Sequence, residues 1–162
     1  MNQISIIFPN QIFRESQILQ LNCEILMIED SLFFGNDKFF KLINHKNKLI
    51  FHKASMLGYK KYLENLGHKV FYIENKNNLS TFDYLSKYLD KKYQKLNILN
   101  PHDFLIMKRI KRFVEVNNLK LQVFRSPMFL TNEDLRESFI SNPKKPLMGR
   151  FYENQRRSLN IL

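Results

Sequence analysis

Five short apolar runs, spaced so that helices fit between them, constrain the fold of this chain more than any other feature. The runs are "ISIIF" (4–8), "EILMIE" (24–29), "KVFYIE" (69–74), "KLNILN" (95–100) and "LKLQVF" (119–124). Each has the length of a strand, and nearly continuous hydrophobicity is typical of strands buried on both faces of a sheet. The pattern therefore predicts five strands.

Three of the intervening segments carry helical patterns. Gly67 is placed to end the first helix, Ser80 or Thr81 to begin the second, and Asp103 to begin the third. The predicted apolar stripes are Leu49, Ile50, Met56, Leu57 and Leu63 in the first, Phe82, Leu85 and Leu89 in the second, and Met107, Ile110 and Val114 in the third.

Strands that alternate with helices predict the fold class. We expect an α/β, Rossmann-like doubly wound sheet of five parallel strands in the order 3-2-1-4-5, with helices on both faces. Ligands of such sheets bind beyond the carboxyl ends of the strands, where the strand order reverses. Residues 1–140 are predicted to form this domain, including a short helix capped by Thr131 and Asp134. Residues 141–162 are predicted as a linker and the start of another helical element.

The charge balance is strongly basic. Lys and Arg number 26 against 15 Asp and Glu, which gives a net charge of +11 at pH 7. Such a charge permits binding to a polyanion, although a general abundance of Lys and Asn set by genome composition explains it equally.

Several classes of site and location are disfavoured. The single cysteine, Cys23, cannot form an internal disulfide or by itself hold a zinc ribbon or a four-thiolate cluster. The four histidines share no metal-ligand spacing, so no metal site is predicted. No leader and no apolar stretch of about 18 residues is apparent, and we expect a cytoplasmic protein without membrane contact.

No catalytic residue is predicted either. None of the four glycines follows the first strand, so neither a dinucleotide fingerprint nor a P-loop can be built there. No serine or cysteine lies in a nucleophile pattern.

Two carboxamides, Asn10 and Gln11, follow the first strand instead. Each offers donors and an acceptor, which suit the imide edge of a pterin, flavin or lumazine ring. Ordinary turn chemistry is the alternative. Glu29 and Asp30 end the second strand, where a carboxylate commonly meets a ribosyl or ribityl hydroxyl, although acidic residues often end strands without any ligand.

The stretch "HKNK" (45–48) places cations at the predicted start of the long helix, where they oppose the helix dipole. An anionic or electron-rich partner near His45 and Lys48 explains this placement. A helix that begins earlier, near Asp37, explains it too. The stretch "KRIKR" (108–112) is interpreted as the solvated face of an amphipathic helix.

Two other functions fit the composition. One is a basic nucleic-acid-binding module without a chromophore, in which one face gathers Lys108, Arg109, Lys111, Arg112, Lys144, Lys145, Arg156 and Arg157. The other is a Rossmann-type enzyme acting on a nucleotide, for which the sequence offers no obvious catalytic group.

In order and spacing, five segments resemble the N-terminal region of the deoxyribodipyrimidine photolyase-related proteins, the family of the iron–sulfur bacterial cryptochromes and photolyases. The segments are "SIIFPNQIF", "EILMIED", "HKNKLIFHKASMLGYKKYLENLGHKVFYIE", "RSPMFLTNEDL" and "GRFYENQRR". The resemblance covers essentially the whole chain but only the first third of a typical family member.

The resemblance implies a Rossmann-like antenna domain that binds 6,7-dimethyl-8-ribityllumazine or a flavin-like chromophore. Asn10 and Gln11 fall on the Asp and Gln of the family's Gly-Asp-Gln, and Pro9 replaces the glycine. Glu29 falls on the family's acidic residue after the second strand. His45 and Lys48 fall on its H-x-x-K, and Phe34 lies near an aromatic that can stack on the chromophore. These residues, apart from Pro9, form the implied cofactor site.

The resemblance also implies light-driven DNA repair in the full-length family, where FAD transfers an electron to a pyrimidine dimer or (6-4) product. FAD and a 4Fe-4S cluster belong to a helical C-terminal domain that would begin near residues 141–162. The expectation is therefore a truncated antenna-type domain that is not itself a lyase. Its expected partners are the chromophore and, within a full-length protein or beside a separate catalytic chain, DNA.

Overall fold

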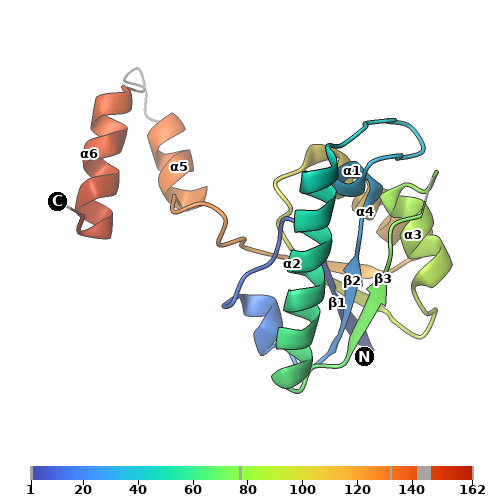
Figure 1. Ribbon diagram of the computed structural model, residues 1–162. Coiled ribbons are helices and arrows are strands. Elements are labelled where there is room, and N and C mark those ends of the chain that lie inside the picture. Colours follow the sequence, from blue (N-terminus) through green and yellow to red (C-terminus); the bar gives the residue numbers. More distant parts are fainter. Residues whose placement is uncertain (1, 77, 132, 142–146, 162) are drawn as a thin grey trace. The chain divides into compact units, whose positions relative to one another are not determined.

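The computed structural model describes residues 2–76, 78–131, 133–141 and 147–161, without the side chains of residues 133–135 and 138. A five-stranded parallel sheet has the order β3-β2-β1-β4-β5 (Figure 1). Its strands are β1 (Gln3–Ile7), β2 (Glu24–Ile28), β3 (Val70–Ile73), β4 (Lys95–Leu99) and β5 (Lys120–Phe124). The predicted fold class and strand order are confirmed.

The three inner strands supply the core. After their first residue, β1, β2 and β4 are buried, whereas the edge strands β3 and β5 are partly exposed. In register, Ile6 of β1 lies opposite Leu26 of β2 and Ile98 of β4. The apolar runs of the three inner strands thus correspond to strands covered on both faces.

One face of the sheet is covered by the long helix α2 (Lys46–Asn65) and by the 3-10 helix η1 (Gln17–Gln20). Met56, Tyr59 and Leu63 of α2 pack on this face. The helix ends at Asn65 and is stopped by Gly67, as predicted. Gly67 has a φ of +88°, and its N–H donates to the carbonyl of Glu64 at 2.9 Å. A left-handed residue at this place is usually glycine, because a Cβ would strain it.

The apolar stripe predicted for α2 is wider than the part that packs on the sheet. Ile50 and Leu57 were expected in the buried stripe, but they are exposed to 55% and 44%. This expectation was wrong because the sheet accepts only the row of Met56, Tyr59 and Leu63. Ile50, Phe51 and Leu57 face outward, whereas Leu49 and Tyr62 are half-buried.

The opposite face of the sheet is covered by α3 (Thr81–Tyr88) and α4 (Phe104–Val116). The Ser80 side chain caps α3 and exchanges hydrogen bonds with Asp83, and the Asp103 side chain caps α4. Both caps match the predicted start residues. A single-turn helix, α1 (Ser31–Phe34), follows β2 directly, and the loop 35–45 joins it to α2.

The chain divides into two compact units, Met1–Ser126 and Pro127–Leu162. The second unit contains the two helices α5 (Glu133–Ile140) and α6 (Met148–Leu159), where helical elements were predicted. The rings of Phe139 and Phe151 lie 4.9 Å apart and join these helices. The predicted contact of Thr131 with Asp134 falls outside the described side chains. The predicted boundary at residue 140 lies at the end of α5.

Candidate functional site

Gln11 fastens the turn after β1 to the neighbouring strand. Its buried side chain accepts a hydrogen bond at Oε1 from the N–H of Phe8, at 3.1 Å, and donates from Nε2 to the carbonyl of Leu99, at 2.9 Å. The second bond crosses to the end of β4. The carboxamide therefore satisfies backbone groups at the place where the sheet ends and its ladder of hydrogen bonds stops.

Asn10 makes a similar connection. Its Nδ2 donates to the carbonyl of Pro101 at 2.9 Å, while its buried Oδ1 has no hydrogen-bond partner among the described residues. Both carboxamides lie where the topology places them, at the ends of β1 and β4. A ring that paired with Gln11 would have to replace backbone bonds, whereas Asn10 retains an unused acceptor.

Glu29, at the end of β2, is the centre of a polar cluster that joins β2, β3 and α2. Its carboxylate is almost fully buried and accepts a hydrogen bond from the hydroxyl of Tyr72. The N–H of Asn75 donates to Oε2 at 2.8 Å, and the ammonium of Lys53 lies 2.7 Å from Oε1. A buried carboxylate requires such partners, and here three of its acceptor positions are used.

The ionisation of this cluster follows from its contacts. Burial lowers the pKa of Lys53, but its bonds to Glu29 and Glu74 outweigh burial and raise that pKa overall. Burial and the neighbouring Glu29 raise the pKa of Tyr72. At neutral pH the cluster therefore contains the ammonium of Lys53 and the protonated phenol of Tyr72, which donates to Glu29.

An apolar groove opens beside this cluster, between the end of α1 and the first half of α2. Its volume is about 510 Å³, and it is lined by Glu29, Phe34, Leu49, Ile50, Lys53, Ala54 and Leu57. The outward-facing Ile50 and Leu57 of α2 are thus walls of the groove. The ring of Phe34 lies 5.9 Å from the ring of His52, whose pKa is lowered by burial and by Lys48. Of the predicted site residues, Glu29 and Phe34 meet here.

His45 and Lys48 lie at the start of α2 and do not line the groove. The helix begins at Lys46, and the Nδ1 of His45 caps it by accepting from the N–H of Asn47 at 3.2 Å. Lys48 donates to the side chain of Asn44 at 3.0 Å. The alternative that the helix begins near Asp37 is therefore wrong, and the cations do lie in the first turn.

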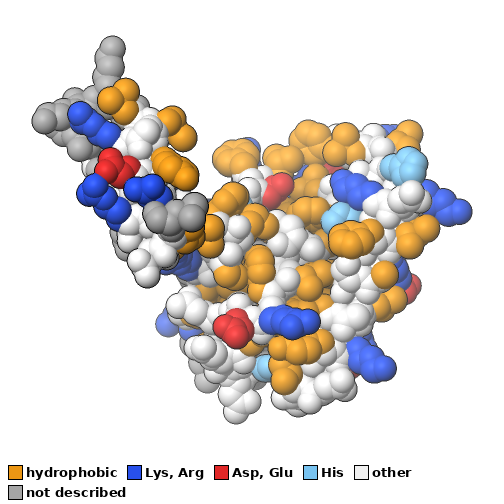
Figure 2. All heavy atoms as spheres, turned by 60° about the vertical axis from the view of Figure 1, so that its left-hand side comes forward, with side chains coloured by type: hydrophobic (Ala, Val, Ile, Leu, Met, Phe, Trp, Pro, Cys, Tyr) orange, Lys and Arg blue, Asp and Glu red, His pale blue; other side chains and the backbone are white. Residues whose placement is uncertain are grey.

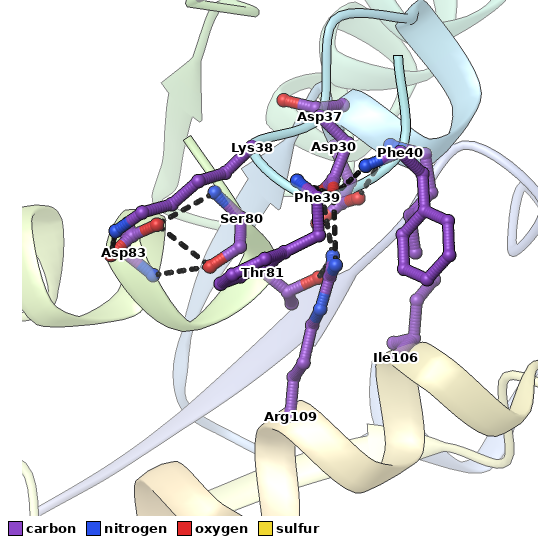
Figure 3. A network of polar contacts seen from close by, with 12 residues as sticks. Asp30, Asp37, Lys38, Phe39, Phe40, Ser80, Thr81, Asp83, Ile106 and Arg109 are labelled. Carbon is purple, nitrogen blue, oxygen red and sulfur yellow. Dashed lines mark hydrogen bonds and ion pairs between the residues drawn. The ribbon is translucent and has the colours of Figure 1, made fainter. Parts of the chain in front are cut away.

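A second polar network, which the sequence did not indicate, fixes the loop between α1 and α2 (Figure 3). Asp37 is fully buried, and its two oxygens bind the guanidinium of Arg109 in α4 at 2.7 and 2.8 Å. Its Oδ1 also accepts from the N–H groups of Phe39 and Phe40, at 3.0 and 3.2 Å. The carboxylate of Asp37 thus holds the loop against α4 through a bidentate ion pair with Arg109.

Arg109 corrects the interpretation of residues 108–112 as a solvated face, because its side chain is only 12% exposed. Nothing in the sequence links it to a partner 72 positions earlier. Asp30 is buried in the same region and accepts from the N–H of Leu32 at 3.0 Å. Burial raises the pKa of Asp30 to about 6.

One of the cations expected on the basic face of a nucleic-acid-binding module is engaged within the fold. Arg109 is engaged by Asp37, and Lys144 and Lys145 lie outside the described residues. Arg156 and Arg157 belong to the second unit. Among the described residues, no group of three or more His, Cys, Asp or Glu side chains could hold a metal ion. In the same part of the chain, no helix has both the length and the apolar character needed to cross a membrane.

Comparison with known proteins places this chain in a family. Residues 5–162 match the family described as deoxyribodipyrimidine photo-lyase-related protein. The uncharacterized protein R852 of Acanthamoeba polyphaga mimivirus is 35% identical over 170 residues, which cover all of this chain and 85% of that protein. Since the family match spans nearly every residue, the chain belongs to the deoxyribodipyrimidine photo-lyase-related proteins.

Proposed function

We propose that the groove between α1 and α2 binds a planar heterocyclic chromophore, either 6,7-dimethyl-8-ribityllumazine or a flavin, which serves as a light-harvesting antenna. The observation that carries this proposal is an apolar groove of about 510 Å³ with the Glu29–Lys53 ion pair in its lining. Small-molecule sites commonly have volumes of about 300–1,000 Å³, apolar walls and a few fixed polar groups. Membership of the photolyase-related family supports the same class of ligand.

The walls of the groove suit an aromatic ring. Leu49 and Ile50 lie near the start of α2, Leu57 lies two turns further along the helix, and Phe34 lines the groove from the end of α1. A flat ring between aliphatic side chains and a phenyl group buries apolar surface, and an offset arrangement with Phe34 adds to this gain.

The polar residues of the groove suit the hydrophilic part of the same ligand. A carboxylate has about four acceptor positions, and Glu29 uses three, so one remains for a ribityl hydroxyl. Lys53 has three donors and uses two, on Glu29 and Glu74, so one remains for a ring carbonyl. These residues would bind and orient the ligand without moving a proton.

The other predicted site residues have a supporting role in this proposal. Asn10, Gln11, His45 and Lys48 do not line the groove. Asn10 and Gln11 fix the ends of β1 and β4, and His45 caps the helix that forms one wall. Lys53, which the sequence analysis did not single out, takes the place of Lys48 as the cation of the site.

When bound, such a ring would absorb light and transfer the energy to FAD. We propose that the repair step, electron transfer from FAD to a pyrimidine dimer or (6-4) product, uses groups outside this chain. The lone Cys23 of this chain could not by itself hold a 4Fe-4S cluster. The residues of this chain would position the antenna and form no bond with the lesion.

The test is a titration of the purified chain with the ribityllumazine and, separately, with riboflavin, followed by fluorescence anisotropy. Ala54→Phe fills the groove from α2 and is expected to weaken binding at least about tenfold, a loss of about 1.4 kcal/mol. Lys53→Met removes the cation and is expected to weaken binding as well.

The matched control is Lys61→Met, which removes an exposed lysine from the same helix at a position outside the groove. It should bind like the unaltered chain. Saturable binding that is insensitive to Ala54→Phe would place the ligand elsewhere, and no binding of either compound would end the proposal.

A further inference from the structure

Three phenylalanines at the carboxyl edge of the sheet are exposed, although side chains of this type are usually buried. Phe39 and Phe40 lie in the loop after α1 and are exposed to 68% and 44%, and Phe104, the first residue of α4, is exposed to 76%. Figure 2 shows hydrophobic side chains along the upper edge of the first unit, with Lys, Arg and His side chains beside them. Exposed apolar surface of this kind indicates an interaction site.

The backbone that carries two of these rings, Phe39 and Phe40, is fixed by a buried carboxylate. The buried Asp37 binds the N–H groups of both Phe39 and Phe40 and is itself bound by Arg109 (Figure 3). The guanidinium of Arg109 lies 5.7 Å from the centre of the Phe39 ring and 5.9 Å from that of Phe40. The loop backbone is therefore fixed while the rings stay exposed, so a partner would bind them at a small entropic cost.

Cations alternate with the rings. The ammonium of Lys38 lies 5.7 Å from the centre of the Phe39 ring, and that of Lys108 lies 5.8 Å from the centre of the Phe104 ring. Lys108 and Arg109 are consecutive residues of α4, so the same turn of this helix supplies a cation to the Phe104 ring and to the two loop rings. We call this set, Lys38, Phe39, Phe40, Phe104, Lys108 and Arg109, the ring–cation surface.

Cations outnumber acids around the ring–cation surface, although Lys38 lies 3.6 Å from the carboxylate of Asp83. From residue 38 to residue 63 the sequence contains no Asp or Glu, and Asp37 is fully buried. The exposed lysines of this stretch near the loop are Lys38, Lys41, Lys46 and Lys48. A partner that complements this surface must therefore be anionic and must also offer flat apolar faces.

We infer that the ring–cation surface binds single-stranded nucleic acid. Unpaired bases stack on exposed aromatic rings irrespective of sequence, and neighbouring lysines bind the phosphates between them. A duplex hides the faces of its bases, so a single strand fits this surface better. The site is separate from the chromophore groove and does not depend on a bound chromophore.

A membrane surface is the competing partner, and the loop itself distinguishes the two. Leu42 and Ile43 are exposed to 56% and 97%. These aliphatic side chains would enter a lipid layer, but they offer no flat face to a base. Binding to nucleic acid must therefore depend on the rings and not on the aliphatic tip of the loop.

The experiment is an anisotropy titration of the full chain with a fluorescein-labelled oligothymidylate of about 12 nucleotides, a length within known single-strand site sizes. Phe39→Ala combined with Phe104→Ala is expected to weaken binding about tenfold or more, since each stacked base contributes about 1–3 kcal/mol. Lys38→Ala combined with Lys108→Ala is expected to reduce the slope of log K against log salt by about 0.7 for each phosphate that the variant no longer neutralises.

The matched control is Phe71→Ala, because Phe71 is an exposed ring with a lysine, Lys69, 5.1 Å from its centre on another part of the surface. Its affinity should equal that of the unaltered chain, as should that of Leu42→Ser combined with Ile43→Ser. Circular dichroism verifies that each variant is folded. Equal losses of affinity in the Phe39 and Phe71 variants would overturn the inference. So would vesicles of phosphatidylserine and phosphatidylcholine that bind the chain through Ile43 while the oligonucleotide does not bind.

Discussion

At the carboxyl edge of the sheet, buried polar side chains fix the local structure. They bind backbone N–H and carbonyl groups or charged side chains. Gln11 shows why the sequence alone could not separate its two uses. The donors and acceptor that suit a ligand ring are the same atoms that bind the backbone of Phe8 and Leu99. Only the three-dimensional structure shows that the side chain of Gln11 binds backbone groups. Glu29 differs, because its carboxylate lines a groove and retains one unused acceptor position.

The Asp37–Arg109 pair should make a large contribution to stability. Asp37→Asn keeps the acceptor for the loop N–H groups but removes the charge that offsets a nearly buried guanidinium. Loss of one partner of a buried ion pair costs about 3–5 kcal/mol. Urea unfolding followed by circular dichroism should show a loss near the lower end of this range. In contrast, Glu153→Gln, in the exposed pair with Arg157, should change the free energy of unfolding by less than about 0.5 kcal/mol.

Asp30 should make stability depend on pH between about 4 and 6. Burial raises its pKa from 3.8 to about 6, so the folded chain holds this proton more tightly than the unfolded chain. The resulting stabilisation is complete below pH 3.8 and is lost as the pH rises through 6. At about 1.36 kcal/mol per unit, the loss is about 3 kcal/mol.

The measurement is the free energy of unfolding of the unaltered chain minus that of Asp30→Asn, determined by urea titration from about pH 4 to about pH 7. The difference should fall with rising pH, because the other groups titrate alike in both proteins. Asp90→Asn, which removes an exposed carboxylate, is the control. A difference that stays constant over this range would show that Asp30 does not titrate there.

At the scale of elements, the sequence predicted where helices begin and end better than which side chains they bury. Caps at Ser80 and Asp103 and the glycine end of α2 are local signals, and the structure contains all three. Ile50 and Leu57 are exposed because the sheet below α2 does not extend under them. The periodicity of the sequence does not reveal the width of the sheet. The same limit concealed the groove, since it is formed by apolar residues that the sheet leaves uncovered.

Two glycines of the α2 region should respond to alanine with opposite signs. Gly58 lies within the helix, and a Cβ there would meet nothing within 4 Å, so Gly58→Ala should stabilise the chain by about 1 kcal/mol. A Cβ at Gly67 would also meet nothing, but its φ of +88° strains any other residue, and Gly67→Ala should destabilise by about 1 kcal/mol. Thermal unfolding of both variants tests this; shifts of the same sign would contradict the assignment of Gly67 as the helix terminator.

At the scale of the whole molecule, the alternation of strands and helices was enough to predict the topology. Right-handed crossovers leave few arrangements for five parallel strands, and the predicted order was among them. The division of the chain at residue 126 has no comparable signal. Contacts between distant residues, such as Asp37 with Arg109, follow from the topology but cannot be assigned from it, because several acids and cations lie near the same edge.

The first unit should fold alone. Both core clusters consist of residues before Arg125, and α6 contains no buried residue. A fragment of residues 1–126 therefore keeps the whole core and should unfold in one cooperative urea transition. A fragment of residues 1–118 is the control, since it lacks β5 and leaves the edge of β4 unpaired. It should lose much of its stability. If the longer fragment also lacks a cooperative transition, residues 127–162 must contribute to the core, and the two units are not independent.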